Sequence, residues 1–183
     1  MDSKKLLVIS DTHGGLKALK AVFNWAKERL PPKDSICAAA FLGDGYDDIY
    51  QVADSTEFSC NWVIVKGNND YSTRDAESAI FDFASHRFFA CHGHRHNLYA
   101  GNQTLISAAR LNGAAIVLSG HTHVPHHKTT NGILLINPGS VGQPRSRIGA
   151  TFAVIECKED QPLKVEFLGI DNKGEIKPVK VKA

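Results

Sequence analysis

Residues 114–123, Ala-Ala-Ile-Val-Leu-Ser-Gly-His-Thr-His, join an apolar run to a pair of histidines. The apolar run is typical of a buried strand. In an extended backbone, residues two apart point to the same side, so we expect His121 and His123 to face one point. Imidazole is the commonest nitrogen ligand of transition metals, but an isolated His-X-His pair is more often exposed to solvent. The pair predicts a metal site only if other segments supply further ligands.

Four earlier apolar runs also end in side chains that can bind a metal ion. Their branched and aromatic residues are typical of buried strands. In chain order, the groups that follow all five runs are Asp11 and His13, Asp44, Asn68, His92, and His121 and His123. Functional groups gather at the carboxyl ends of strands in α/β sheets. If the runs are neighbours in one sheet, all seven groups meet along one edge, and glycines at 14, 43, 67, 93 and 120 supply the tight turns.

Helical periodicity appears between these runs. Apolar spacing predicts one helix from Leu16 that stops at Pro31-Pro32, a short helix near residues 49–53, and another over 102–112. Asp47 and Asp48 are interpreted as acids in the first turn of the short helix, where they favour the helix dipole. After residue 125, hairpin and strand patterns dominate, at 131–136, 151–156, 163–168 and 176–181. We therefore expect one α/β domain over residues 1–183 with a second sheet.

The bulk composition excludes several classes of protein. The chain has 183 residues and a formal net charge of +2, too little to indicate binding to nucleic acid or to an acidic membrane. Its four cysteines, at 37, 60, 91 and 157, form no Cys-X-X-Cys pair, and three lie in or beside apolar runs. No segment has the length of a membrane span or of a signal-peptide core. We expect a cytoplasmic protein, and both a monomer and a homo-oligomer remain open.

The number of ligands indicates two metal ions. Seven groups exceed the needs of one ion of low coordination number. A natural division gives one ion Asp11, His13 and His123, and gives the other Asn68, His92 and His121, with Asp44 shared. Oxygen and nitrogen ligands without thiolate favour Mn, with Zn, Ni or Fe as alternatives. Two such ions about 3.5–4 Å apart are suited to hydrolysis at phosphorus.

The motifs that carry these ligands resemble those of the calcineurin-like metallophosphoesterase superfamily. They are Asp11-X-His-Gly, Gly43-Asp, Gly67-Asn-X-Asp, His92-Gly-His and Gly120-His-Thr-His. The short length and the stretch 137–145, Asn-Pro-Gly-Ser-Val-Gly-Gln-Pro-Arg, resemble its small phosphodiesterase branch, the YfcE-like group. The resemblance implies a four-layer αββα sandwich with two mixed β-sheets. It also implies a two-metal site at the strand ends, with the same division of ligands.

One position departs from the pattern. Many members of the superfamily have a histidine after the motif asparagine, proposed to protonate the leaving group. Here that residue is Asn69, which cannot act as a general acid. The small phosphodiesterase branch often lacks this histidine as well, so the loss favours good leaving groups, or a proton from water or a nearby histidine.

Several residues around the ligands have two readings. His94 is expected to contact substrate or to orient a ligand, and is preferred to His96, which shares its polar loop. Arg145 and Arg147 match phosphate geometry, but Arg145 is equally suited to holding its own loop. Asp70 is expected to support the Asn68 loop. The remaining histidines, His86, His126 and His127, are expected at the surface.

Together these features predict a metal-dependent phosphodiesterase acting on small phosphoesters by in-line attack of a hydroxide that bridges two ions. We assign catalytic roles to Asp44, Asn68 and His94, and substrate contacts to Arg145 and Asn69. The alternatives are a phosphomonoesterase or dinucleoside polyphosphate hydrolase using the same site, or a non-catalytic scaffold of the same fold. A eukaryotic retromer subunit is such a scaffold, with a degenerate metal site. The complete set of seven ligands argues against that reading here.

Overall fold

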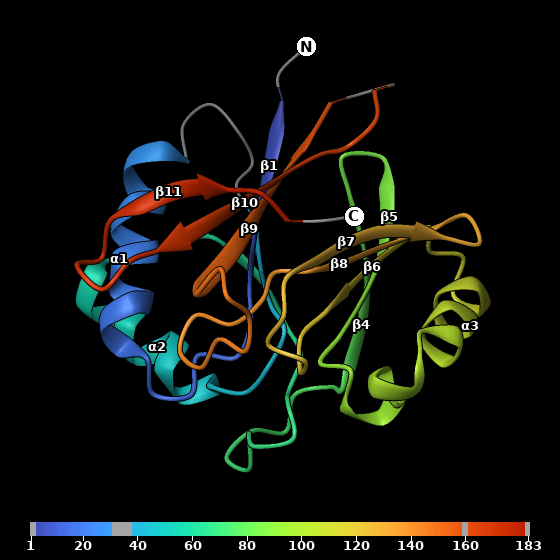
Figure 1. Ribbon diagram of the computed structural model, residues 1–183, viewed down its shortest axis with the longest axis horizontal. Helices are drawn as coiled ribbons and strands as arrows, with labels where there is room; N and C mark the ends of the chain where they lie inside the picture. The colour runs from blue at the N-terminus through green and yellow to red at the C-terminus, as the bar shows by residue number, and fades with distance from the viewer. Residues whose placement is uncertain (1–2, 31–37, 159–160, 182–183) are drawn as a thin grey trace.

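The protein consists of two mixed β-sheets packed face to face, with α-helices on both outer surfaces (Figure 1). The computed structural model describes residues 3–30, 38–158 and 161–181. The expected helix stop at Pro31-Pro32, the start of the second apolar run and Cys37 lie outside the described residues. The four-layer αββα sandwich expected from the sequence is confirmed.

The larger sheet has six strands in the order β11-β10-β9-β1-β2-β3. Its strands β1, β2 and β3 are parallel, whereas β9, β10 and β11 form antiparallel pairs beside β1. Their bounds are β1 Lys4–Ile9, β2 Ala38–Phe41, β3 Asn61–Ile64, β9 Ala150–Cys157, β10 Lys164–Ile170 and β11 Ile176–Val179.

The smaller sheet has five strands in the order β4-β5-β6-β8-β7. Its centre, β5, β6 and β8, is parallel, and an antiparallel strand closes each edge. Their bounds are β4 Ser78–Phe83, β5 His86–Cys91, β6 Ile116–Ser119, β7 His126–Thr130 and β8 Ile133–Asn137. The hairpin expected at Asn131-Gly132 connects β7 to β8.

Strand β1 shows why the central runs are continuously apolar. Side chains alternate between the two faces of a strand. Leu7 and Ile9 pack into the core beneath the helices, and Leu6 and Val8 pack into the core between the two sheets. All four are fully buried, as expected for a parallel strand covered on both faces.

The helices bury one apolar stripe each. Helix α1, Leu16–Arg29, packs Leu19, Val22, Phe23 and Ala26 against the six-stranded sheet, and α2, Tyr46–Thr56, lies beside it. Helix α3, Gln103–Leu111, covers the opposite sheet through a separate apolar cluster. Two short 3₁₀ helices, η1 His94–His96 and η2 Leu98–Ala100, precede α3. None of the helices in the described ranges has both the length and the apolar character needed to cross a membrane.

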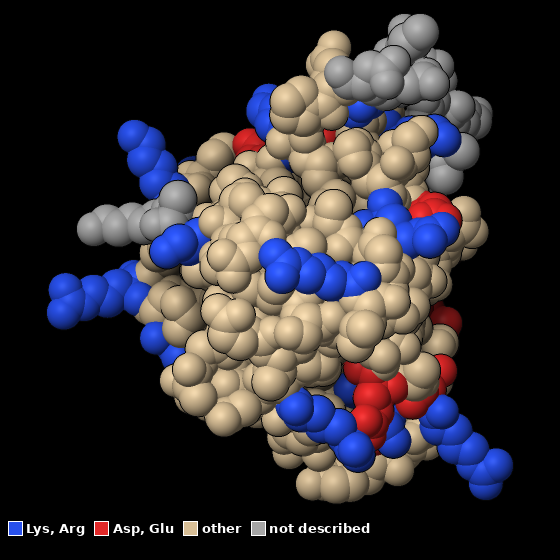
Figure 2. All heavy atoms as spheres, turned by 90° about the vertical axis from the view of Figure 1, so that its right-hand side faces the viewer, with Lys and Arg blue, Asp and Glu red and all other residues tan. Residues whose placement is uncertain are grey.

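The face that carries α3 shows no continuous basic band. In Figure 2 the Lys and Arg side chains on this face are separated by uncharged surface.

Candidate metal centre

The seven candidate ligands lie in loops that follow strands of both sheets. The expectation of a single sheet edge is wrong in this respect. Loops after β1, β2 and β3 carry Asp11, His13, Asp44 and Asn68, and loops after β5 and β6 carry His92, His121 and His123. The two sheets pack with their carboxyl ends at the same end of the sandwich, so the ligands still converge.

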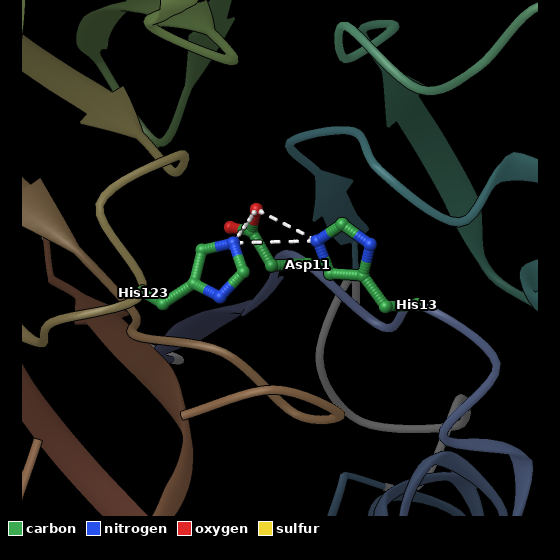
Figure 3. A group of neighbouring side chains, drawn as sticks. All are labelled: Asp11, His13 and His123. Carbon is green, nitrogen blue, oxygen red and sulfur yellow. Dashed lines mark hydrogen bonds and ion pairs between the residues drawn. The ribbon is translucent and has the colours of Figure 1, made fainter. Parts of the chain in front are cut away.

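One group joins Asp11, His13 and His123 (Figure 3). Nε2 of His123 lies 3.0 Å from Oδ1 of Asp11, and Nε2 of His13 lies 3.8 Å from the same oxygen. The two imidazole Nε2 atoms are 3.3 Å apart. Three ligand atoms thus surround one point, as the sequence-based division expects for the first ion.

A second group forms around His92. Its Nε2 lies 3.2 Å from Oδ1 of Asn68, 3.3 Å from Nδ1 of His121 and 3.4 Å from Oδ2 of Asp44. The same Asp44 oxygen is 3.5 Å from Nε2 of His13. Asp44 therefore lies between the two groups, where a shared carboxylate is needed.

Hydrogen bonds to backbone carbonyls fix the orientation of two imidazoles. Nδ1 of His92 lies 2.7 Å from the Leu42 carbonyl oxygen, and Nδ1 of His123 lies 2.5 Å from that of Gln143. Each Nδ1 must donate its proton to the carbonyl, so each Nε2 points into the site. This is the usual outer arrangement of metal-binding histidines.

The donor set fits a divalent cation. Oδ1 of Asp11 is buried and accepts no hydrogen bond, and imidazole nitrogens and carboxylate oxygens face one another across the site. Lone pairs in this arrangement repel unless a proton or a cation lies between them. Mixed oxygen and nitrogen donors without a thiolate suit a divalent transition metal.

The pKa values of these groups reflect the same electrostatics. Burial works against ionisation of Asp11, but the neighbouring imidazoles of His123 and His13 hold its pKa well below the usual range. Burial also opposes ionisation of Asp44, yet His92 lowers its pKa to about 2. Asp11 raises the pKa of His13. Burial works to lower the pKa of His92, but the carboxylates of Asp44 and Asp11 outweigh burial, and the pKa is raised. The carboxylates thus favour positive charge at this point, as they would favour a bound cation.

Five of the seven candidate ligands adopt left-handed backbone conformations. They are Asp11, His13, Asp44, His121 and His123, with φ between 41° and 68°. Such conformations are uncommon for residues other than glycine and cluster at functional sites. The extended backbone expected for His121 and His123 is therefore wrong: the two side chains diverge from a turn, one into each group.

Two glycines allow the loops to approach one another. A Cβ on Gly120 would overlap Oγ of Ser10 and Oδ2 of Asp11, and a Cβ on Gly67 would overlap Oδ1 of Asp44. Neither glycine has a positive φ. Their role is close approach between loops and not, as expected from the sequence, a sharp turn.

Carboxylates outside the ligand set tie the loops together. Asp70 accepts hydrogen bonds from the backbone N–H groups of Asp44, Gly45, Tyr46 and Gly67, at 2.7–2.9 Å. This confirms its expected support of the Asn68 loop and extends that support to the Asp44 loop.

A second tie joins the first loop to α2. Asp48, in the first turn of α2 as expected, accepts hydrogen bonds from Thr12 Oγ1 and Gly14 N at 2.6 and 2.7 Å. The sequence analysis missed this contact, as well as the bond from Ser10 Oγ to Asp11 Oδ2 at 2.5 Å. Ser10 directly precedes Asp11, so its contact could have been inferred from the sequence. Nothing in the sequence around Asp48 indicates its contact with the first loop.

Asn69 contacts Asp44. Its backbone N–H donates to Oδ1 and its side-chain amide to Oδ2, at 2.8 and 2.7 Å. The side chain that we expect to touch substrate also fixes the carboxylate that lies between the two ligand groups.

The rim of the site includes His94, Tyr99 and Arg145. His94 lies beside His92 and His121, with ring centroids 5.4 and 6.3 Å away, and its buried Nδ1 has no hydrogen-bond partner. Burial lowers the pKa of His94. Arg145 donates from Nη1 to the hydroxyl oxygen of Tyr99 at 3.0 Å, so it holds more than its own loop. Tyr99 was not identified from the sequence.

The remaining candidates lie elsewhere. Arg147 is exposed, and His96 faces the thiol of Cys91. Burial raises the pKa of Cys91 to about 12, so this thiol, directly before His92, stays protonated and outside the ligand set. The three histidines expected at the surface, His86, His126 and His127, are half-buried, and Nε2 of His126 is enclosed without a hydrogen-bond partner.

Comparison with known proteins identifies relatives of this architecture. The Bacillus subtilis protein YsnB, described as a probable metallophosphoesterase, is 28% identical over 160 residues, 85% of each chain. A Streptococcus pneumoniae crystal structure described as that of a predicted phosphoesterase superposes with a TM-score of 0.75, at 29% identity over 98% of each chain.

Structures of lower identity share the fold. Escherichia coli YfcE, described as a phosphoesterase, has a TM-score of 0.65 at 22% identity, covering 96% of this chain and 98% of its own. Vps29 from Entamoeba histolytica, solved with Zn²⁺, has a TM-score of 0.71 at 20% identity, covering 97% and 98%. The family model of the calcineurin-like phosphoesterase superfamily domain matches residues 5–160. The chain belongs to the calcineurin-like phosphoesterase superfamily.

Proposed function

We propose that the protein is a phosphodiesterase that holds two divalent metal ions and hydrolyses small phosphodiesters. Family membership supports a metal-dependent phosphoesterase. The observation that carries the finer proposal is the pair of ligand groups that share Asp44. Oδ2 of this residue lies 3.5 Å from His13 in one group and 3.4 Å from His92 in the other.

The first ion would be held by Asp11, His13 and His123, the second by Asn68, His92 and His121, and Asp44 would bind both. The absence of thiolate from this set favours Mn, with Zn, Ni and Fe as alternatives. When bound, two such ions supply a hydroxide for in-line attack at phosphorus and stabilise the charge on the phosphoryl oxygens.

The protein's own groups orient this chemistry. Asn69 holds both oxygens of Asp44 in place, and the carbonyls of Leu42 and Gln143 aim His92 and His123 into the site. Such outer contacts preorganise the ligands before substrate arrives. Arg145 offers a guanidinium at the rim that forms no ion pair within the described chain, so it is free to meet a phosphoryl oxygen.

The leaving group needs a proton, and Asn69 cannot supply it. His94 lies next to the second ligand group, but its lowered pKa keeps the imidazole neutral at pH 7. A neutral imidazole can orient a water or a leaving oxygen through a hydrogen bond, and water supplies the proton. Esters whose leaving group is stable as an anion, such as aryl esters, are therefore the favoured substrates.

The test combines metal content with turnover. The protein is purified with and without chelator, reloaded with Mn, Ni or Zn, and offered bis-aryl phosphates, mono-aryl phosphates and cyclic nucleotides. We expect two ions per chain and the highest kcat/KM on diesters. A metal-loaded protein with no turnover on any ester would favour the alternative of a non-catalytic scaffold. The fold shared with Vps29 is the reason to consider that alternative. Preference for monoesters would favour the phosphomonoesterase.

A further inference from the structure

Tyr99 presents an exposed aromatic ring beside the metal ligands. Its side chain is 69% exposed, and its ring centroid lies 5.7 Å from that of His121, with the rings inclined at 63°. Single exposed aromatic side chains are common, as at Tyr71, so the position of Tyr99 and not its exposure is what matters here. The position next to a ligand of the second group makes a substrate contact the natural candidate.

The backbone under Tyr99 is fixed. Tyr99 is the middle residue of η2, which lies between Asn97 with φ 47° and Gly101 with φ 129°. The neighbouring Leu98 packs against the apolar cluster beneath α3 and closely over Gly93, where an added Cβ would lie 2.6 Å from a Leu98 methyl. Leu98 therefore anchors the turn inward while Tyr99 stays outside, as a preformed platform.

Arg145 connects this platform to the opposite ligand group. Its backbone N–H donates to the carbonyl oxygen of His123 at 3.1 Å, and its guanidinium reaches the hydroxyl of Tyr99 at 3.0 Å. The side chain thus runs along the rim from the loop of one ligand group to the aromatic neighbour of the other. Four further N–H donors of the guanidinium remain for a ligand.

The geometry points to Tyr99 and Arg145 as a substrate clamp for a phosphodiester that carries a planar aromatic group, a nucleobase or an aryl ring, next to the phosphate. The guanidinium of Arg145 binds a non-bridging phosphoryl oxygen, and the planar group stacks on the Tyr99 ring. This clamp rests on the proposed function and gives it a substrate class.

Both contacts follow known preferences of these side chains. A guanidinium and a phosphate form charge-assisted hydrogen bonds in a fixed plane. Stacking of bases on aromatic side chains is favourable and tolerates different bases, since every base has a π-face. The clamp therefore selects a class of ester and not one base.

Two substrates with the same leaving group test the clamp. Thymidine 5′-(p-nitrophenyl phosphate) and methyl p-nitrophenyl phosphate both release p-nitrophenol, and only the remaining ester group differs. We expect Tyr99→Ala to raise KM for the thymidine ester at least about 5-fold and to change the methyl ester less than about 2-fold. Tyr99→Phe should keep KM for the thymidine ester within about 2-fold, since it retains the ring.

Arg145→Ala should raise KM for both esters alike, because both carry the phosphate. Tyr71→Ala is the matched control, since Tyr71 is also an exposed tyrosine, at 89%. Equal effects of Tyr99→Ala on both esters, or no effect on either, would overturn the clamp and leave the phosphodiesterase intact.

Binding gives a readout independent of turnover. Thymidine 5′-monophosphate and methyl phosphate are titrated calorimetrically into the metal-loaded protein and its variants. We expect Tyr99→Ala to weaken binding of the thymidine nucleotide at least about 5-fold and to leave methyl phosphate unchanged. If the wild-type protein hydrolysed neither ester, the proposed function would fail, and this titration would still decide for or against the clamp.

Discussion

The two sheets contribute different chemistry to the same site. The loops of the six-stranded sheet provide the oxygen ligands Asp11, Asp44 and Asn68, together with His13. The loops of the five-stranded sheet provide only imidazoles, from His92, His121 and His123. Neither sheet alone has a complete ligand set. The two shortest carboxylate–imidazole contacts, from Asp11 Oδ1 to His123 Nε2 at 3.0 Å and from Asp44 Oδ2 to His92 Nε2 at 3.4 Å, each join a loop of one sheet to a loop of the other.

The loops are also held in place differently. On the oxygen side, the carboxylates of Asp48 and Asp70 accept backbone N–H groups and tie neighbouring loops together. On the imidazole side, backbone carbonyls orient His92 and His123 individually. The comparison teaches that the oxygen side sets the spacing of the two ligand groups, while the imidazole side completes each group separately.

The sharpest test removes the ligand that both groups share. Asp44→Ala should reduce bound metal from two ions per chain to almost none, with affinity lowered by more than about 100-fold, beyond the loss typical of outer contacts. Turnover should disappear with the metal. Metal analysis of the purified variant measures this, with Asp47→Ala, in the first turn of the adjoining helix α2, as control. A fully active Asp44→Ala protein would refute the site.

Removing an imidazole should have a smaller effect. His121→Ala disrupts only the group around His92, so Asp11, His13 and His123 should still hold one ion. Metal content should fall from two ions to one, as measured by elemental analysis after dialysis. His127→Ala, on strand β7 and half-buried, serves as control. Loss of both ions from His121→Ala would show that the imidazole side also sets the spacing.

The outer ties predict a loss of stability that does not depend on metal. Asp70→Ala leaves four backbone N–H groups without their acceptor, and Asp70 is only 8% exposed. We expect the free energy of unfolding of the metal-free protein to fall by about 1–3 kcal/mol, measured by urea titration. Asp54→Ala, exposed on α2, should change it by less than about 0.5 kcal/mol. An unchanged Asp70→Ala protein would contradict the proposed role of this tie.

The smallest effect concerns pH. The pKa values of His13 and His92 are raised, so in the metal-free chain protons compete with a metal ion for these imidazoles up to a higher pH than at an unperturbed histidine. Metal-induced stabilisation, measured as the rise in Tm with and without Mn, should therefore increase from pH 6 to pH 8. Proton release on binding, measured in buffers of different ionisation enthalpy, should decrease over the same range. A pH-independent Tm rise would mean that neither imidazole is a ligand.

The sequence predicted which side chains converge, because their signal is local. Each follows an apolar strand by a few residues, and the carboxyl ends of such strands meet at one end of an α/β fold. The αββα layers and the shared position of Asp44 agree with this reading.

What the sequence did not reveal depends on contacts between distant segments. The distribution of ligands over two sheets follows from the packing of the Leu6 and Val8 face against the second sheet. The left-handed conformation of His121 and His123 depends on the loops that surround them. The place of Tyr99 follows from how Leu98 packs over Gly93, which no local periodicity encodes.

The buried thiol of Cys91 makes the edge of the site resistant to oxidation. Its thiol is 1% exposed and titrates near pH 12, although the next residue in the chain is His92. Oxidants react with thiolates, and this sulfur remains a thiol throughout the range in which the protein would work. The loop after β5 should therefore tolerate peroxide or prolonged exposure to air without covalent modification of Cys91.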